Sequence, residues 1–240
     1  MTELLYYLDA TLANFEATVT AVEEGEKGLR VALDRTAFYP GGGGQPCDLG
    51  WLTVNGVRAE VTAVGKDGGS IWHTFQGASV PQAAAPVSGE LNWERRHLLM
   101  RTHTAMHILC GVVWRDYGAQ VTGGNMDPGE GRMDFEFASL SRELITEIEA
   151  RCNAEVAAAR DVRTQILPRD EAFQIPDLIR TKINLLPAGI SEVRTVEIVG
   201  LDLQADGGTH VLNTREVGTI KVVDYKSKGA INKRIYIRLG

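Results

Sequence analysis

"WERRHLLMRTHTAMHILCGVVWRDYG" (residues 93–118) is the stretch that decides how the second half of the chain folds. Its apolar residues recur at helical spacing, and Gly118 stands where a helix commonly ends, so we expect one long helix here. On that helix His103 and His107 are four residues apart, which places both imidazoles on one face. A helix offers two nitrogen ligands to one metal ion at this spacing. Taken alone, such a pair is more often two ordinary histidines of the core or the surface.

A second pair of candidate ligands stands near the end of the chain, in "LQADGGTHVLNT" (residues 203–214). Asp206 and His210 are four residues apart. Gly207 and Gly208 between them allow the backbone to fold tightly enough to bring both side chains inward. Three imidazole nitrogens and one carboxylate suit Zn²⁺, with either four protein ligands or three and a water, and Asp206 binding directly or through a water. We therefore expect one zinc ion per chain, with the ligands His103, His107, Asp206 and His210.

The helical pair lacks the glutamate of the metalloprotease pattern His-Glu-x-x-His, because Thr104 occupies its place. The sequence therefore argues against a peptidase. It also offers no obvious general base beside the expected ligands. Two roles for the metal stay open: activation of a bound water and positioning of the substrate.

The third feature is a glycine-rich motif, "AFYPGGGGQPCDLG" (residues 37–50). It is not a phosphate-binding P-loop, because no Gly-Lys-Ser/Thr follows and no helix is expected to open there. One reading is a plain wide turn. The other is a loop whose bare backbone approaches a ligand closely, and in that case we expect contacts from Gly43, Gly44, Gln45 and Asp48.

The rest of the chain predicts two domains. Residues 1–80 read as short strands, with hairpin turns expected near residues 26–28, at 55–56 and at 66–70, so a small barrel or sandwich is indicated. Residues 76–90 are poor in large apolar side chains and carry two prolines. We place the boundary there, giving a β-barrel domain over 1–88 and a metal-binding domain over 89–240. A second helix over 139–162, then strands, makes the latter α+β, with helices packed on an antiparallel sheet.

Composition bounds the class of protein. The chain has 240 residues, 44% hydrophobic and 23% charged, which is ordinary for a globular protein. No apolar run is long enough for a membrane span, and the N-terminal stretch is acidic where a signal peptide would be basic. The three cysteines are widely spaced and include no Cys-x-x-Cys. A reducing cytoplasm is therefore the expected location.

Charge is distributed unevenly along a chain whose net charge is −6. Residues 1–90 hold 5 Lys and Arg against 11 Asp and Glu, whereas residues 221–240 hold six basic residues and one acidic. A local basic segment can neutralise phosphates on an acidic protein, because screening hides more distant charges. The alternative is a solvated hairpin with lysines at its edge.

Three motifs in this order carry a resemblance to a known family. "GGGGQPCDLG", "RTHTAMHILC" and "ADGGTHVLNTREVGTIKV" resemble the editing domain of alanyl-tRNA synthetase, and more closely the free-standing, medium-sized AlaX alanyl-tRNA editing proteins. The resemblance covers nearly the whole chain. It implies an N-terminal β-barrel, an editing domain, and a trans-editing esterase that hydrolyses Ser-tRNA(Ala), Gly-tRNA(Ala) or both at the acceptor end of the tRNA.

Two positions depart from the family's pattern. Asp206 stands where the family usually has the Cys of "CGGTH", and carboxylate is an acceptable zinc ligand. The family also has a polar Gln soon after the helix with the histidine pair, where this chain reads "GAQVTGGN". We expect Thr122 or Thr209 to bind the serine hydroxyl at the catalytic site, and Gly207 and Gly208 to contact the substrate.

Two other functional classes stay open beside the editing enzyme. The same four ligands could form a closed structural site in a non-catalytic, zinc-stabilised nucleic-acid binding module. They could also serve a metal-dependent hydrolase of small esters or amides, which the basic C-terminal segment mildly disfavours. A homodimer is one assembly open to the chain.

Overall fold

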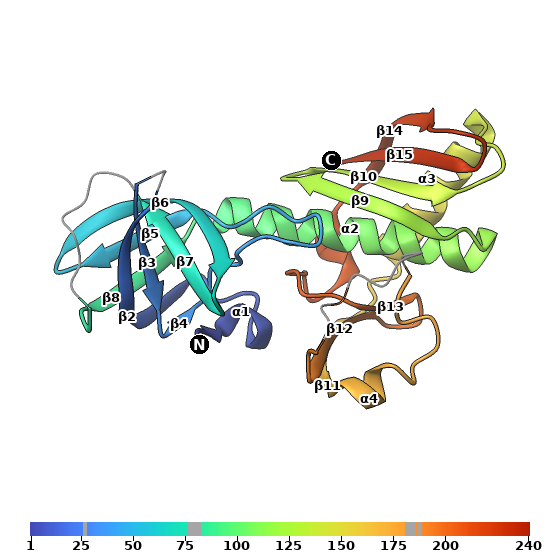
Figure 1. Cartoon of the computed structure of the whole chain (residues 1–240). Helices are drawn as coiled ribbons and strands as arrows, with labels where there is room; N and C mark the ends of the chain where they lie inside the picture. The colour runs from blue at the N-terminus through green and yellow to red at the C-terminus, as the bar shows by residue number, and fades with distance from the viewer. Residues whose placement is uncertain (26–27, 76–82, 181–185, 187–188) are drawn as a thin grey trace. The chain divides into compact units, whose positions relative to one another are not determined.

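A computed structural model describes residues 1–25, 28–75, 83–180, 186 and 189–240 (Figure 1). The chain divides into two compact units, Met1–Leu98 and Leu99–Gly240. The elements of the first unit are β1 (Glu3–Leu4), α1 (Leu5–Leu8), β2 (Asn14–Gly25), β3 (Gly28–Leu33), β4 (Arg35–Thr36), β5 (Gly50–Val54), β6 (Val57–Asp67), β7 (Ser70–Phe75) and β8 (Pro86–Leu91), followed by the first residues of α2 (Trp93–Tyr117).

The first unit is built on a closed barrel, in the strand order β2-β3-β7-β6-β5-β8 (Figure 1). Alternate side chains of β2 point inward, and the barrel core is apolar, with Val31, Leu52, Val61 and Ile71 almost fully buried. The predicted small barrel is thereby confirmed. Part of the stretch expected at the domain boundary belongs to it, since β8 pairs with both β2 and β5 and closes the barrel. Residues 76–82 of that stretch lie outside the described residues.

Two of the three predicted hairpin turns are in place. Asn55 and Gly56 both have positive φ, 50° and 77°, and join β5 to β6, as expected of a tight Asn-Gly hairpin. Gly68 and Gly69 do the same between β6 and β7, with φ of 57° and 80°. Strands β2 and β3 pair up to Gly25 and Gly28, and the two turn residues between them lie outside the described residues.

The second unit is α+β, as predicted. Its sheets are antiparallel: four strands in the order β14-β15-β10-β9, and three in the order β11-β12-β13. Its elements after α2 are β9 (Val121–Asp127), β10 (Glu130–Glu136), α3 (Arg142–Ala157), β11 (Val162–Pro168), α4 (Arg169–Ala172), β12 (Glu192–Ile198), β13 (Asp202–Ala205), the 3₁₀ turn η1 (Thr214–Val217), β14 (Ile220–Ser227) and β15 (Asn232–Leu239).

Helix α2 packs against both sheets of the second unit (Figure 1). Glycines make the close approach possible on each side. A Cβ on Gly131 of β10 would lie 3.0 Å from Met106 Sδ of the helix. On the other side, a Cβ on Gly111 of the helix would lie 2.9 Å from Leu201 Cγ and 3.0 Å from the Cβ of Asp202. The Leu201 side chain and the Cβ of Asp202, at the start of β13, therefore pack directly against the helix backbone at Gly111.

The structure confirms the end of the first predicted helix and corrects the bounds of the second. The long helix ends at Tyr117, and Gly118, with φ of 64°, follows it as expected. The second helix is shorter than predicted and begins after Ser141, whose hydroxyl accepts a hydrogen bond from Leu144 N. Strands β9 and β13 and the short helix α4 were not predicted.

The compact units divide after Leu98, inside α2, whereas the predicted domains divide after residue 88. The division into a barrel domain and a metal-binding domain at 88/89 stays a prediction. Among the described residues, no helix combines the length and the apolar character needed to cross a membrane.

Candidate metal centre

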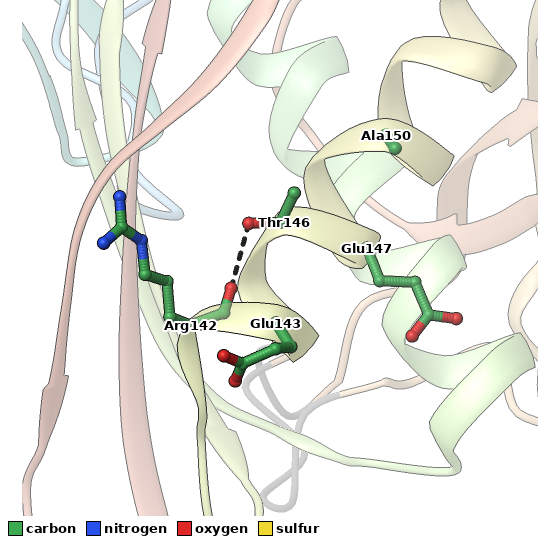
Figure 2. Close-up of a pocket in the computed structure, with 5 residues that line it drawn as sticks. All are labelled: Arg142, Glu143, Thr146, Glu147 and Ala150. Carbon is green, nitrogen blue, oxygen red and sulfur yellow. Dashed lines mark hydrogen bonds between the residues drawn. The ribbon is translucent and has the colours of Figure 1, made fainter.

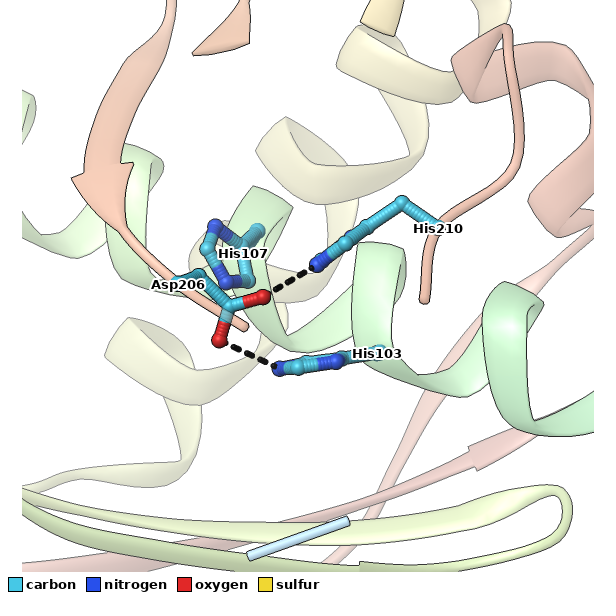
Figure 3. A group of neighbouring side chains, drawn as sticks. All are labelled: His103, His107, Asp206 and His210. Atoms are coloured by element: carbon cyan, nitrogen blue, oxygen red, sulfur yellow. Dashed lines mark hydrogen bonds and ion pairs between the residues drawn. The ribbon is translucent and has the colours of Figure 1, made fainter. Parts of the chain in front are cut away.

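Four side chains of the second unit converge on one buried point. His103, His107, Asp206 and His210 each offer a ligand atom, and these atoms lie within 4.8 Å of one another. Figure 3 shows the three imidazoles arranged around the Asp206 carboxylate, whose Oδ2 lies 2.9 Å from His210 Nε2 and whose Oδ1 lies 3.7 Å from His103 Nε2. The His103 and His210 rings are stacked at 4.3 Å, and His107 meets His210 edge-on at 4.7 Å.

Two segments far apart in the sequence supply these groups. Helix α2 presents His103 and His107 one turn apart, as the spacing predicts. The loop after β13 supplies the other pair, and it is held by hydrogen bonds on both sides. Within the loop, Gly208 N donates to Asp206 Oδ2 at 2.8 Å. From β12, Arg194 Nη1 donates to the carbonyl oxygens of Asp206 and Gly208 at 3.0 and 2.9 Å.

The outer ring nitrogens of two histidines have partners of their own. His107 Nδ1 lies 3.1 Å from Asp202 Oδ2, and His210 Nδ1 lies 3.2 Å from Thr104 Oγ1. The carboxylate can only accept, so its contact fixes the proton on Nδ1 of His107 and leaves Nε2 for a metal, whereas the Thr104 hydroxyl, which can donate or accept, holds the orientation of the His210 ring. Thr104 occupies the place of the metalloprotease glutamate, and here its hydroxyl supports a histidine of the other segment.

Burial and neighbouring charges set the protonation of the cluster. Burial lowers the pKa of His103 to about 4 and that of His210 well below its usual value. Burial also lowers the pKa of His107, but the hydrogen bond and charge of Asp202 outweigh it and leave that pKa raised. Burial would raise the pKa of Asp206, yet His103 and His210 favour its charged form and hold the pKa well below the usual range. A neutral imidazole and an ionised carboxylate are the forms that bind metal.

The donor set fits a transition-metal ion. Imidazole nitrogens suit Zn²⁺ and its neighbours, whereas Mg²⁺ and Ca²⁺ require mostly oxygen ligands. Three buried histidines and one half-buried aspartate also give the coordination number that zinc prefers. The cluster could therefore hold a metal ion, through the four residues that the sequence predicts.

The glycine-rich motif lies in the first unit and forms a tight turn. Gly42 N and Gln45 N each donate to the other residue's carbonyl at 3.0 Å. The four consecutive glycines at 41–44 have positive φ, between 60° and 126°, which explains why glycine fills each of these positions. No described residue comes within 4 Å of a Cβ built on Gly43.

Asp48, at the end of this motif, is buried and its oxygens are engaged. Oδ2 accepts from Tyr39 N at 2.7 Å, and both oxygens accept from Arg96 Nε at 3.0 Å. This pairing gives Asp48 a structural function in the barrel unit. Substrate contacts by Gly43, Gly44, Gln45 and Asp48 stay a prediction.

The two candidate threonines occupy different environments. Thr209 is fully buried between Gly208 and the expected ligand His210. Thr122 is exposed on β9, and its hydroxyl donates to Asn232 Oδ1 at 3.0 Å. A catalytic role for either, and substrate contacts by Gly207 and Gly208, stay predictions. Sequence reasoning missed Asp202, Thr104 as a partner of His210, and Arg194, because none of them stands in a spacing pattern with the residue that it supports.

A hollow elsewhere on the second unit differs in character. Figure 2 shows it along α3, where one helix supplies all five lining residues: Arg142, Glu143, Thr146, Glu147 and Ala150. A groove on one helix face brings no side chains together from distant segments. In the described part of the chain, only the cluster of Figure 3 gathers three or more potential metal ligands.

Comparison with known proteins relates segments of both units to tRNA synthetase domains. Residues 193–236 match the family described as threonyl and alanyl tRNA synthetase second additional domain, and residues 3–95 match class II (A) tRNA synthetases. Alanyl-tRNA editing protein AlaX-M of Methanosarcina mazei is 38% identical over 100% of this chain and 97% of its own length. The AlaX-M protein of Saccharolobus solfataricus is 37% identical over 98% of each. An alanine–tRNA ligase of Methanococcus maripaludis is 38% identical over 92% of this chain but only 24% of its own.

Proposed function

We propose that the chain, which belongs to the AlaX-M family of alanyl-tRNA editing proteins, is a trans-editing deacylase of the cytoplasm. Its substrates would be Ser-tRNA(Ala), Gly-tRNA(Ala) or both, cleaved at the ester bond that joins the amino acid to the tRNA. The observation that carries the proposal is the buried cluster of three histidines and one aspartate. Two of its residues, Asp206 and His210, lie in the segment 193–236 that matches the second additional domain of threonyl and alanyl tRNA synthetases.

We assign the cluster to one Zn²⁺ per chain, with Asp206 in place of the usual cysteine. A bound zinc ion would act as a Lewis acid. It would either lower the pKa of a bound water or hold the amine or ribose of the substrate. The residues of the chain hold the site in shape for this chemistry. Arg194 fixes the loop of Asp206, and Thr104 and Asp202 orient two of the imidazoles.

Selectivity against alanine requires a polar group, because apolar packing alone separates serine from alanine poorly. A buried hydroxyl that pairs with the serine side chain is left unpaired when alanine enters, at a cost of roughly 1–3 kcal/mol. Thr209 suits this role because it is buried beside His210. Thr122 suits it less, since it is exposed on β9.

The basic C-terminal strands would guide the acceptor end of the tRNA. Much of the positive charge of these strands already has a partner within the sheet, so tRNA phosphates would compete with these contacts. Phosphate binding also releases counterions, and the affinity for tRNA would therefore fall as the salt concentration rises. The pairs are Lys226 with Asp224, Arg234 with Asp134, and Arg238 with Glu130, while Lys233 Nζ donates to the carbonyl oxygens of Gly229 and Ala230.

Deacylation of tRNA(Ala) charged separately with serine, glycine and alanine tests the proposal. We expect release of serine or glycine, little release of alanine, and loss of activity after zinc chelation while the far-ultraviolet circular dichroism persists. Ser-tRNA(Ser) is the control for recognition of tRNA(Ala). Chelation that unfolds the protein, together with no deacylation by the zinc-loaded form, would instead favour the non-catalytic nucleic-acid binding module.

A further inference from the structure

A second carboxylate lies directly behind the candidate metal centre. Asp202 opens strand β13, four residues before Asp206, and its side chain is fully buried. Three donors converge on it. His107 Nδ1 is 3.1 Å and Gln204 Nε2 is 2.6 Å from Oδ2, while Arg180 Nε is 3.4 Å from Oδ1. A buried carboxylate is tolerated only with such partners, so this one has a defined orientation.

The contact with Asp202 determines which nitrogen of His107 is available to a metal. A carboxylate oxygen accepts, so Nδ1 of His107 carries the proton and donates it. The ring then turns its Nε2 edge toward His103 and His210, whose rings lie 5.1 and 4.7 Å away. Without an acceptor behind it, the ring could flip or change tautomer and present no lone pair to the cluster.

Asp202 is itself held from the far side. The guanidinium of Arg180 stacks over the Trp114 ring at 4.9 Å while it contacts the carboxylate. Gln204, two residues along β13, donates to Asp202 and lies 3.3 Å from Cys110 Sγ of the helix. The carboxylate therefore connects helix α2 to the strand that leads into Asp206.

We infer that Asp202 is a positioning residue that orients His107, so that its Nε2 becomes a metal ligand. The inference rests on the proposed zinc site and goes beyond the four ligands. Outer partners of this kind raise the basicity of the ligand and fix its direction, and their loss typically costs about 10–100-fold in metal affinity.

A purely structural ion pair with Arg180 is the competing explanation, and a matched control separates the two. Asp177 is a second carboxylate beside Arg180 among the described residues, with Oδ2 4.0 Å from Nη1, and its side chain is 60% exposed. Its φ of 56° is one that asparagine accepts readily. Asp177→Asn therefore perturbs Arg180 without touching His107, whereas Asp202→Asn changes both.

The experiment measures zinc affinity by competition with a chromophoric chelator, for the wild type, Asp202→Asn, Asp202→Ala and Asp177→Asn. We expect about 10–100-fold weaker binding for Asp202→Asn, at least as large a loss for Asp202→Ala, and no change for Asp177→Asn. The Co²⁺-substituted forms should show an altered d–d spectrum only in the Asp202 variants. Asp202→Asn is nearly isosteric and keeps the test decisive if Asp202→Ala does not fold.

Nitrogen-15 NMR of histidine-labelled, zinc-loaded wild-type protein gives the direct reading. We expect His107 to carry its proton on Nδ1 and the metal on Nε2. Coordination through Nδ1 would overturn the inference, as would equal zinc affinity for Asp202→Asn and Asp177→Asn. A wild-type chain that binds no zinc would overturn the proposed function as well, so the two failures are distinguishable.

Discussion

Each unit of the molecule buries histidine, but the two units use it differently. In the barrel, His73 stands alone: Thr36 Oγ1 lies 2.8 Å from its Nε2, and the Val31 carbonyl oxygen lies 3.3 Å from its Nδ1. Because a carbonyl only accepts, Nδ1 carries the proton, and both ring nitrogens are satisfied by the barrel itself. In the second unit, three imidazoles instead turn toward one another and toward Asp206.

The contrast shows that burial alone does not identify a ligand. His73, His103 and His107 are all nearly inaccessible to solvent. His73 has an apolar neighbour, the Phe38 ring at 5.3 Å, and its two ring nitrogens contact a hydroxyl and a carbonyl oxygen, which is the pattern of a satisfied core residue. His103 and His107 of α2 meet carboxylates from the other segment, and this convergence indicates a metal site.

The largest effect is expected where a ligand is removed. His103→Ala should lose bound zinc and lower deacylation of mischarged tRNA(Ala) to the uncatalysed background, because the loss of a direct ligand exceeds the loss of an outer partner. His73→Leu, the matched barrel variant, should keep one zinc per chain. Metal analysis and deacylation rates measure both. If the His103→Ala protein still bound zinc and deacylated the tRNA, His103 would not be a metal ligand, and its burial would mean no more than that of His73.

A smaller effect, about 3 kcal/mol, is expected from pH in the barrel. Burial lowers the pKa of His73 to about 4 from 6.5, so the unfolded chain binds a proton that the folded chain refuses between these values. The free energy of unfolding should therefore fall as pH drops from about 6.5 to 4, by about 3 kcal/mol from this residue. Denaturant unfolding of wild type and His73→Leu over this range isolates the contribution. Parallel pH profiles would show that His73 does not contribute.

The smallest effect concerns selectivity within the second unit. Thr209→Val should reduce the preference for Ser-tRNA(Ala) over Ala-tRNA(Ala) by roughly tenfold, within the ~1–3 kcal/mol of a lost buried hydrogen bond. Thr122→Val, which removes an exposed hydroxyl paired with Asn232, should change the preference little. Ratios of kcat/KM for the two substrates measure this. An unchanged preference in Thr209→Val would remove that residue from recognition.

Local signals in the sequence were enough to predict much of the fold. The Asn55-Gly56 turn and the end of α2 before Gly118 each follow from conformational preferences of single residues. Strand β9 was missed because Gly123 and Gly124 weaken the strand pattern, and its pairing with β10 supplies the stability instead. Strand β13 has only four residues, too few for periodicity to show.

The candidate site likewise has residues that the sequence predicts and residues that it does not. The four expected ligands stand in two pairs with i,i+4 spacing, which is visible in one dimension. Asp202 lies 95 residues from His107, and their contact exists only because two distant segments pack together. No periodic pattern encodes such a contact, so the ligands were predictable and their supports were not.

Gly111 gives this packing a consequence for protein engineering. Replacing a glycine within a helix by alanine is a standard route to thermostability, and by propensity it should gain about 1 kcal/mol. At residue 111 the added methyl group would occupy the space of Leu201 and the Cβ of Asp202. A consensus or propensity-guided redesign of this helix would strengthen the helix while forcing apart the two segments that carry the cluster, so this glycine should be held fixed in any stabilised variant.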